Sequence, residues 1–266
     1  MIKMNIRDLS RECIEIFRKS LNSSLHITTP SIPILYFGNK PAYNKSKIKI
    51  ITVGLNPSYN EFPVNDRFKY FRKAENINLN LELTQDDIRL YLEALNDYFI
   101  DDSYNWFKWF EPILNGMNAS YYENKDPNRV LHTDICSPFA TNLTWSKKKF
   151  HRDQKANMIK EGKKIWHKLV ELLDPDIIII SVAKKYLKNI QLNQSKWIEF
   201  HRIYRKQDGT KRKLPYIVTI SKYNTSTDKG YLVFGQAAQI PFGTISGPQK
   251  HELGQKLLTL ARSRAR

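Results

Sequence analysis

The sequence predicts an α/β protein, a three-layer α/β/α sandwich around a mostly parallel central sheet. Strand-like runs of β-branched and other apolar residues recur at 48–53, 129–135 and 176–182. Helical segments separate these runs, and parallel strands require crossover connections of that length. The chain has 266 residues and no linker rich in Pro, Gly or Ser, so we expect one main domain with a full core.

The helices are indicated by apolar spacing and by caps. The segment 6–21 places Leu9, Cys13 and Phe17 on one helical face. Thr84 is a favourable N-cap for a helix that reaches about residue 100. In chain order, the predicted helices cover 6–21, 84–100, 104–114, 153–173, a short segment from Ala183, and about 249–262.

A hairpin follows the third strand. Residues 197–205 and 214–221 flank Asp208-Gly209, a dipeptide that favours a tight turn between antiparallel strands. Residues 222–248 are then expected to form a loop before the last helix. The expected organisation is an N-terminal helix and lead-in segment at 1–45, and a domain at 46–266 with a helical insertion at about 84–115.

The chain is strongly basic. It contains 43 Lys and Arg against 26 Asp and Glu, a formal charge of +17 with a pI of about 9.7. A surplus of this size on a globular composition predicts a polyanionic partner, with nucleic acid favoured. Three alternatives also explain the surplus: a ribosome-associated protein, a membrane-surface protein, or drift in an AT-rich genome that favours Lys.

Cysteine usage and hydropathy bear on location. Cys13 and Cys136 lie far apart and beside no other metal-ligand pattern, which predicts a reduced, cytoplasmic, metal-free protein. Residues 1–12 are polar and lack the apolar core of a signal peptide. The longest aliphatic run, Ile177–Ile180, is far too short to cross a bilayer. We therefore expect no membrane partner, and we expect a monomer.

The most informative segment is the turn after the first strand, Gly54-Leu-Asn-Pro-Ser58. Gly54 permits a sharp turn or a close approach of the backbone to a ligand. Asn56 places an amide just beyond the strand's carboxyl end, where open α/β sheets bind their ligands. Ser58 offers a hydroxyl and an N–H to a phosphate. An ordinary strand-to-loop turn is the alternative.

Three loops that follow predicted strands, 54–72, 136–152 and 222–248, are expected to gather at one edge of the sheet. Basic and aromatic residues interleave in the first two, as phosphate neutralisation and base stacking require. Phe68 and Tyr70 are expected at this surface, with core packing as the alternative. The residues expected to contact DNA here are Ser58, Arg67, Trp145, Lys147, Lys148 and Lys149.

Other chemical motifs are sparse. His132-Thr-Asp134 places a His and an Asp on one face of a strand, which suits a metal pair, although a structural pair is the alternative. The sequence contains no Walker motif, no Gly-x-Ser-x-Gly and no Cys/His cluster. We therefore expect neither a metal nor a cofactor.

The strand followed by Gly-Leu-Asn-Pro-Ser resembles the first motif of the uracil-DNA glycosylase superfamily. It is closest to the mismatch-specific and single-strand-selective branches, whose version is Gly-x-Asn-Pro-Gly. The resemblance implies a uracil-DNA glycosylase-like fold over about 48–262 and a role for Asn56 in holding the water that attacks the sugar. The layout of Glu61-Phe62-Pro63, Arg67-Phe68 and His132-Thr-Asp134 is also similar to a branch that includes bacterial anti-phage glycosylases, which remove modified cytosines from viral DNA.

The family's second motif lies in a late loop before the final helix. In the mismatch-specific branch it contains Asn-Pro-Ser-Gly and wedges the duplex; here Thr244-Ile-Ser-Gly247 agrees only in its last two residues. The His that many members use there to stabilise the departing uracil is absent, which favours a modified pyrimidine over uracil. We expect Phe242 and Ile245 to act as wedges, with burial beneath the loop as the alternative. The residues of this loop expected to contact DNA are Phe242, Ile245, Ser246, Gly247 and Lys250.

N-glycosidic cleavage passes through an oxocarbenium-like sugar, so it requires a positioned water and a pocket for a flipped base. Asn56 would orient the water. Asp134 would assist it or read the base edge, with an ion-paired structural role as the alternative. The expected base pocket comprises Gly54, Leu55, Tyr59, Phe68, His132 and Asn224, with Thr141, Asn142 and Trp145 as further pocket or DNA contacts.

The sequence therefore predicts a monofunctional, metal-free DNA glycosylase that leaves an abasic site, in anti-phage defence or base-excision repair. Two other functions stay open. One is a non-catalytic nucleic-acid-binding module that keeps the fold and the charge. The other is a metal-dependent nuclease that uses His132 and Asp134.

Overall fold

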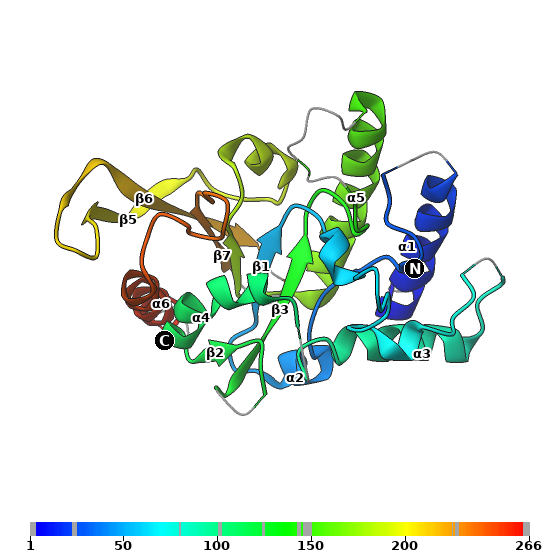
Figure 1. Cartoon of the computed structure of the whole chain (residues 1–266). Helices are drawn as coiled ribbons and strands as arrows, with labels where there is room; N and C mark the ends of the chain where they lie inside the picture. The colour runs from blue at the N-terminus through cyan, green and yellow to red at the C-terminus, as the bar shows by residue number, and fades with distance from the viewer. Residues whose placement is uncertain are drawn as a thin grey trace. The chain divides into compact units, whose positions relative to one another are not determined.

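A seven-stranded, mostly parallel sheet organises the fold, in the order β2-β3-β1-β4-β7-β6-β5 (Figure 1). This computed structural model describes residues 4–22, 26–79, 81–100, 103–123, 126–142, 145, 151–224, 226 and 229–262. The chain divides into unit 1, made of 1–39, 54–104 and 132–173, and unit 2, made of 40–53, 105–131 and 174–266. The predicted separation of a segment 1–45 from a domain 46–266 stays a prediction.

Strand pairing confirms the α/β class and the mostly parallel sheet. β4 (Ile177–Ile180) pairs in parallel with β1 (Ile50–Gly54) on one side and with β7 (Lys229–Gly235) on the other. β2 (Ala119–Ser120) is parallel to β3 (Asn128–Asp134). β6 (Lys211–Asn224) is antiparallel to both β7 and β5 (Ile198–Arg205).

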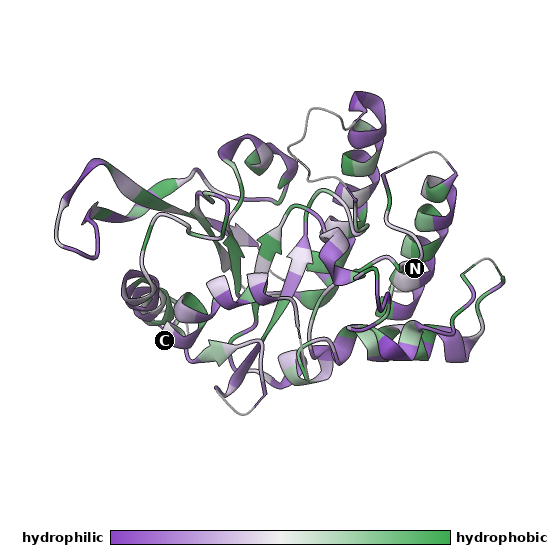
Figure 2. Cartoon of the chain, in the orientation of Figure 1, coloured by the Kyte–Doolittle hydropathy of each residue, from purple (hydrophilic) through white to green (hydrophobic). Residues whose placement is uncertain are grey.

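The central strands form because their side chains are apolar on both faces. Every residue of β1 and β4 is buried, and the register places Ile50 beside Ile177 and Val53 beside Ile180. A strand covered on both faces has no need of alternating polar residues. The strongly hydrophobic central strands are visible in Figure 2.

β7 corrects the prediction that 222–248 is one loop. Residues Lys229–Gly235 lie between β4 and β6, with Tyr231 in register with Ile177 and Phe234 with Ile180. The segment is short and bounded by glycines, and its partners are distant in sequence. The apolar run Tyr231–Phe234 between two glycines is compatible with a buried strand, and pairing with β4 and β6 makes it one.

Unit 1 contains the helices α1 (Ile6–Leu21), α3 (Gln85–Asn96) and α5 (Arg152–Leu173), close to their predicted bounds. Asn5 caps α1, which buries Leu9, Cys13 and Phe17 as expected. The Trp166 Nε1 of α5 donates to Thr133 Oγ1 at 3.0 Å, next to the end of β3. The unit also contains two short 3₁₀ helices, η1 (Tyr59–Glu61) and η2 (Arg72–Ala74).

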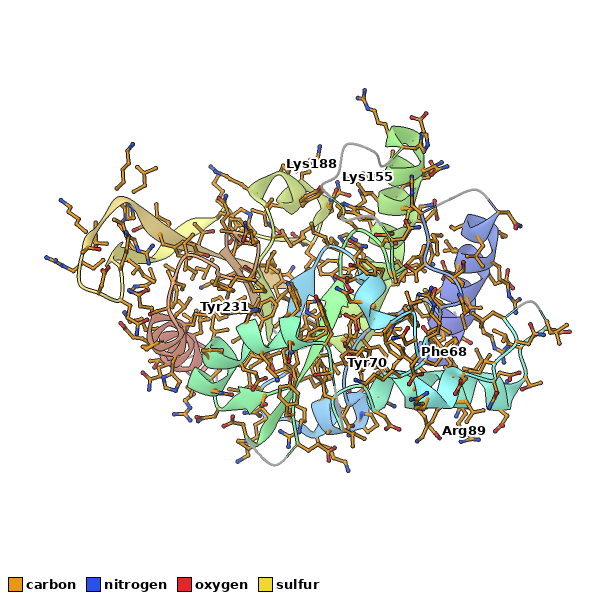
Figure 3. The ribbon with its side chains drawn as sticks, in the orientation of Figure 1. Phe68, Tyr70, Arg89, Lys155, Lys188 and Tyr231 are labelled. Atoms are coloured by element: carbon orange, nitrogen blue, oxygen red, sulfur yellow. The ribbon has the colours of Figure 1, made fainter. Side chains whose placement is uncertain are left out.

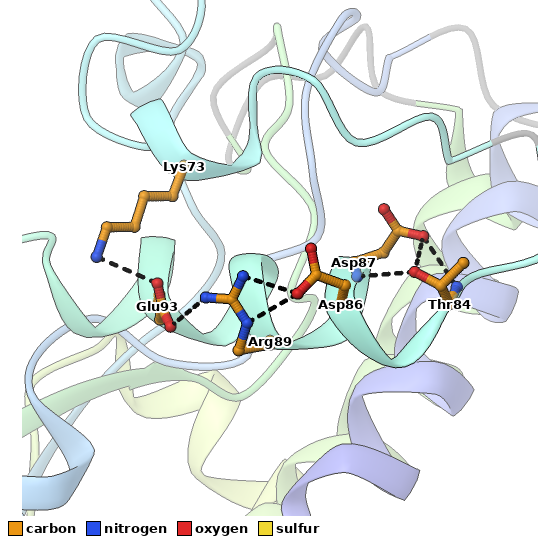
Figure 4. Close-up of polar contacts among 6 residues, drawn as sticks. All are labelled: Lys73, Thr84, Asp86, Asp87, Arg89 and Glu93. Carbon is orange, nitrogen blue, oxygen red and sulfur yellow. Dashed lines mark hydrogen bonds and ion pairs between the residues drawn. The ribbon is translucent and has the colours of Figure 1, made fainter.

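The start of α3 is held by polar contacts (Figure 4). The Thr84 and Asp87 side chains accept reciprocally from each other's backbone N–H groups, at 3.1 and 2.9 Å. This capping box satisfies N–H groups that the first helical turn leaves free. Arg89 bridges Asp86 and Glu93, and Lys73 of η2 reaches Glu93 at 3.2 Å. These contacts tie η2 to α3 within unit 1.

Unit 2 contains α2 (Lys40–Lys45), α4 (Glu111–Gly116) and α6 (Gly247–Arg262), with the 3₁₀ helices η3 (Asn105–Trp109) and η4 (Lys184–Asn189). α4 and α6 approach closely through glycines. A Cβ added to Gly254 would lie 2.1 Å from the carbonyl oxygen of Ile113. Among the described residues, no helix combines the length and the apolar character that a bilayer span requires.

Candidate active site

Two loops of unit 1 lie side by side where β1 and β3 end. The N–H of Ile135 donates to the carbonyl oxygen of Gly54 at 3.1 Å, and that of Cys136 donates to Leu55 at 2.9 Å. A further bridge joins Ser58 to Thr141. The carboxyl ends of adjacent strands thus bring together residues that lie about eighty positions apart in the sequence, as open α/β sheets generally do.

Asn56 is held in one orientation at this junction. Its Nδ2 donates to the carbonyl oxygen of Pro57 at 2.8 Å and to Thr141 Oγ1 at 3.0 Å. Both contacts involve the amide nitrogen, so among the described residues Oδ1 is left to accept a hydrogen bond from a small molecule. The residue is partly exposed. The amide is therefore oriented and accessible, as water positioning requires.

Gly54 makes room for two buried polar side chains. A Cβ at Gly54 would lie 2.5 Å from Asp134 Oδ1 and 2.9 Å from His132 Nε2. The side chain of His132 is 2% exposed and that of Asp134 is 4% exposed. His132 Nε2 lies 3.6 Å from Asp134 Oδ1. Gly54 is not among the glycines with positive φ. Glycine is thus required here for space and not for backbone conformation.

Glu61 is a site residue to which the sequence assigns no role. It is 3% exposed, and its carboxylate accepts a hydrogen bond from the hydroxyl of Tyr98. Burial, joined by the negative charge of Asp134, raises the pKa of Glu61 to about 8, although the Tyr98 hydrogen bond opposes the rise. At neutral pH Glu61 is therefore mostly protonated, so the site contains a neutral buried acid.

An aromatic cluster excludes water from these acids. The ring of Phe37 lies 5.7 Å from that of His132 and 4.8 Å from that of Tyr98. The rings of Phe62 and Phe71 stack at 5.2 Å beside Glu61's segment. Burial among rings disfavours a charged carboxylate, which is the main cause of the raised pKa of Glu61.

The pKa of Glu61 makes stability depend on pH. Between about pH 4.5 and 8 the unfolded chain loses this proton while the folded chain retains it, so folding stability falls as pH rises through that window. Replacing Glu61 with Gln keeps an acceptor for Tyr98 and removes the titration. We expect the melting temperature of Glu61→Gln to exceed the parent's by an amount that grows with pH, equivalent to a few kcal/mol at about pH 8.

Thermal melts of both proteins across this pH range test the expectation. Glu75→Gln is the control, because Glu75 is exposed and pairs with Arg72 at 4.0 Å. A gap between Glu61→Gln and parent that stays constant with pH would show that Glu61 is ionised in the folded protein.

The structure places the remaining residues predicted in unit 1 as follows. Leu55 and Phe68 are partly exposed, and Tyr59 is 45% exposed. Phe68 and Tyr70 lie on the segment between η1 and η2 (Figure 3). The Ser58 hydroxyl accepts from Asn60 N at 3.2 Å, and Arg67 donates to the carbonyl oxygen of Phe62 at 2.7 Å. The pocket and DNA contacts of these residues stay predictions.

Trp145 is not the exposed stacking residue that the sequence predicts. Its side chain is buried, at 4% exposure, and Lys155 of α5 lies 5.2 Å from its ring (Figure 3 labels Lys155). Lys155 also donates to the backbone carbonyl of Trp145. Local composition could not reveal this burial, because α5 supplies the covering side chain. Lys147, Lys148 and Lys149 lie outside the described residues.

Asn224 is wrongly predicted to follow the last strand. It is the last residue of β6 and is paired with Lys229 at the amino end of β7. β7 runs parallel to β4 and β1. Asn224 therefore lies at the amino edge of these strands, away from the carboxyl edge where ligands bind, because the sequence did not reveal β7 as the final strand.

The late loop is packed into unit 2 in a way that contradicts the wedge interpretation. Phe242 is fully buried and Ile245 is 5% exposed. The centre of the Phe242 ring lies 6.3 Å from that of Phe110 and 6.5 Å from that of Tyr216. Both apolar side chains are therefore core residues, the alternative that the sequence left open.

Lys250 is likewise no surface contact. It is 3% exposed, and its Nζ donates to the carbonyl oxygens of Pro241 at 2.8 Å and Trp109 at 3.0 Å. Burial lowers the pKa of Lys250 to about 8. Ser246 and Gln249 exchange hydrogen bonds at the start of α6. Gly247 is exposed, and the DNA contacts of Ser246 and Gly247 stay predictions.

Removing the Ile245 side chain should therefore affect folding first. We expect Ile245→Ala to lower the free energy of unfolding by roughly 2–4 kcal/mol, the range for truncating a buried aliphatic residue. Val64→Ala, at a position 77% exposed, should change it by no more than about 0.5 kcal/mol. Urea denaturation measures both. A parental stability for Ile245→Ala would restore the wedge interpretation.

The metal interpretation depends on His132 and Asp134 finding further ligands. Within the described residues, no group of three or more His, Cys, Asp or Glu side chains is arranged to hold a metal ion. The pair supplies two donors, and structural or catalytic zinc sites use at least three protein ligands.

Comparison of the chain with models of known protein families and with curated proteins found no match.

Proposed function

We propose that this protein is a DNA glycosylase that hydrolyses the N-glycosidic bond of a modified pyrimidine and leaves an abasic site. The observation that carries the proposal is the placement of Asn56. Its amide nitrogen is engaged by Pro57 and Thr141, which leaves Oδ1 as the acceptor of a partly exposed side chain two residues after the end of β1. The resemblance of Gly54-Leu-Asn-Pro-Ser58 to the first uracil-DNA glycosylase motif supports the same role.

The reaction does not require a strong nucleophile from the protein. Water adds to the anomeric carbon as the bond to the base breaks, and the electron pair of that bond leaves with the base. The proton lost by the water passes to solvent or to the base. Asn56 Oδ1 would accept a hydrogen bond from the attacking water and align it. The carboxylate of Asp134 would stabilise the positive charge that develops on the sugar.

Glu61 would act through Asp134 and not on the substrate. It is buried and hydrogen-bonded to Tyr98, and its high pKa keeps it neutral. A second charged carboxylate beside Asp134 would raise the electrostatic cost of the site. A neutral Glu61 therefore adds no second negative charge near Asp134, which lies next to Gly54.

A DNA partner is supported by the net charge of +17. The preference for a modified base is supported by the late loop, which lacks the His that many superfamily members use to stabilise uracil. A glycosylase-like topology and a three-layer arrangement are part of this proposal, as is the choice between defence and repair.

One assay tests the activity against both alternatives. The protein is incubated in EDTA with DNAs of one sequence that carry unmodified bases, uracil, or 5-substituted cytosines, and the products are treated with alkali. Strand cuts that require alkali and fall at one base type are the expected result. Direct cuts that EDTA suppresses would indicate a nuclease using His132 and Asp134, and binding without cuts would indicate a non-catalytic module.

A further inference from the structure

The hairpin of β5 and β6 extends past the rest of the sheet. β6 pairs with β7 only from Val218 to Asn224, so residues 211–217 pair with β5 alone. Val218 lies opposite Gly235, the last residue of β7. The two-stranded segment 201–217, here termed the ribbon, therefore projects beyond the carboxyl end of β7 in unit 2 (Figure 1).

The ribbon is densely basic. Residues 201–214 contain six Lys or Arg and a single acidic residue, Asp208. Lys211 and Lys213 are exposed, and within the described part of the chain neither forms an ion pair. The far end of the hairpin is predominantly hydrophilic in Figure 2. Uncompensated cations on a projecting element attract a polyanion.

A cation and an aromatic ring lie together on the ribbon. Arg202 lies opposite Ile217, its guanidinium pairs with Glu199, and it is 6.0 Å from the centre of the Tyr204 ring, which is 56% exposed. Lys213 lies further along β6, where the pairing shifts register between Ile203–Tyr216 and Arg205–Lys211. Ile203 and Tyr216 turn toward the body of unit 2, where both are buried.

The part of the ribbon next to its turn is fixed to the late loop and to the start of α6. Arg212 Nη2 donates to the carbonyl oxygen of Thr244 at 2.7 Å, and Gln249 Nε2 donates to that of Arg205 at 2.8 Å. The late loop is itself held by the buried side chains of Phe242 and Ile245. The loop predicted to enter DNA thus holds the basic hairpin in place.

We propose that the ribbon binds duplex DNA and lies in its major groove. A two-stranded ribbon fits that groove, and Lys and Arg on both strands reach the phosphates that border it. An anionic membrane suits the ribbon less well, because its most exposed apolar side chains, Tyr204 and Leu214, are separated by the polar and charged segment 205–213. The inference rests on the proposed function only in its choice of DNA as the polyanion.

Binding of the full chain to a short labelled duplex without a target base tests the ribbon. Lys211→Ser/Lys213→Ser is compared with Lys45→Ser/Lys47→Ser, which removes two exposed cations near the amino end of β1. We expect the ribbon variant to bind roughly tenfold more weakly or worse at low salt. The slope of the logarithm of the binding constant against the logarithm of the salt concentration is negative. Its magnitude should decrease by about 1.8, that is by about 0.9 for each lost phosphate contact. The control should bind like the parent.

Equal affinity and equal slope for the two double variants would overturn the proposal. So would binding to phosphatidylserine vesicles that depends on Lys211 and Lys213 while duplex binding does not. The alkali assay separates this outcome from the fate of the proposed function. If DNA binding depends on Lys211 and Lys213 but the protein excises no base, the glycosylase proposal is refuted and the ribbon proposal is supported. If excision is normal but DNA binding does not depend on Lys211 and Lys213, the ribbon proposal is refuted and the glycosylase proposal is supported.

Discussion

Replacing Asn56 with alanine is expected to lower the rate of base excision by on the order of 10²–10³-fold. The substitution removes the acceptor that would align the attacking water, and losing one preorganised polar group in a transition state typically costs this much. DNA affinity should change little, since the amide carries no charge. Single-turnover excision, with binding measured in parallel, gives both quantities.

Two further variants test whether orientation of the amide matters. Thr141→Val removes the hydroxyl that receives Asn56 Nδ2 at 3.0 Å, and Thr141→Ser keeps it. We expect Val to slow excision and Ser to restore it. Asn60→Ala is the control, because it removes an amide from the same loop that instead donates to the Tyr104 hydroxyl at 2.9 Å. If Asn56→Ala excises bases at the parental rate, Asn56 does not hold the water.

Gly54→Ala is expected to disable the site without removing a polar group. The new methyl would lie 2.5 Å from Asp134 Oδ1 and 2.9 Å from His132 Nε2, so both buried side chains must shift. Overpacking of this kind costs about 1–3 kcal/mol of stability. A displacement of about 1 Å at a reacting centre costs roughly 10²-fold in rate, so we expect a loss of that size in excision.

A matched glycine separates crowding from the general effect of alanine. Gly247→Ala introduces a methyl with no atom within 4 Å, so its melting temperature should equal the parent's. Gly54→Ala should melt lower yet remain folded by circular dichroism at the assay temperature. Parental activity of Gly54→Ala would mean that Asp134 can move freely and is not part of the reaction centre.

Local signals in the sequence determined much of the framework. The apolar spacing of 6–21 and the Thr84 cap predicted α1 and α3 because helix formation and capping depend on neighbours within one turn. The isoleucine run predicted β4, and Asp208-Gly209 predicted the turn between β5 and β6. The sequence also placed Asn56 directly after β1, since the strand ends at Gly54.

Only the tertiary structure decided which polar and apolar side chains are buried. Glu61 gains its high pKa from burial and from the nearby charge of Asp134, a residue far from it in the sequence, while the Tyr98 hydrogen bond only partly offsets the rise. Phe242 and Ile245 have the composition of either wedges or core, and packing in unit 2 makes them core.

The position of β7 was decided in the same way. Its residues 229–235 become a strand because β4 and β6 pair with it on either side. That assignment moved Asn224 to the opposite edge of the sheet and left the ribbon of β5 and β6 projecting beyond it. Strand pairing and burial depend on contacts between residues that are distant in the sequence. Local sequence patterns therefore predict the individual elements of this site but not which of them come together.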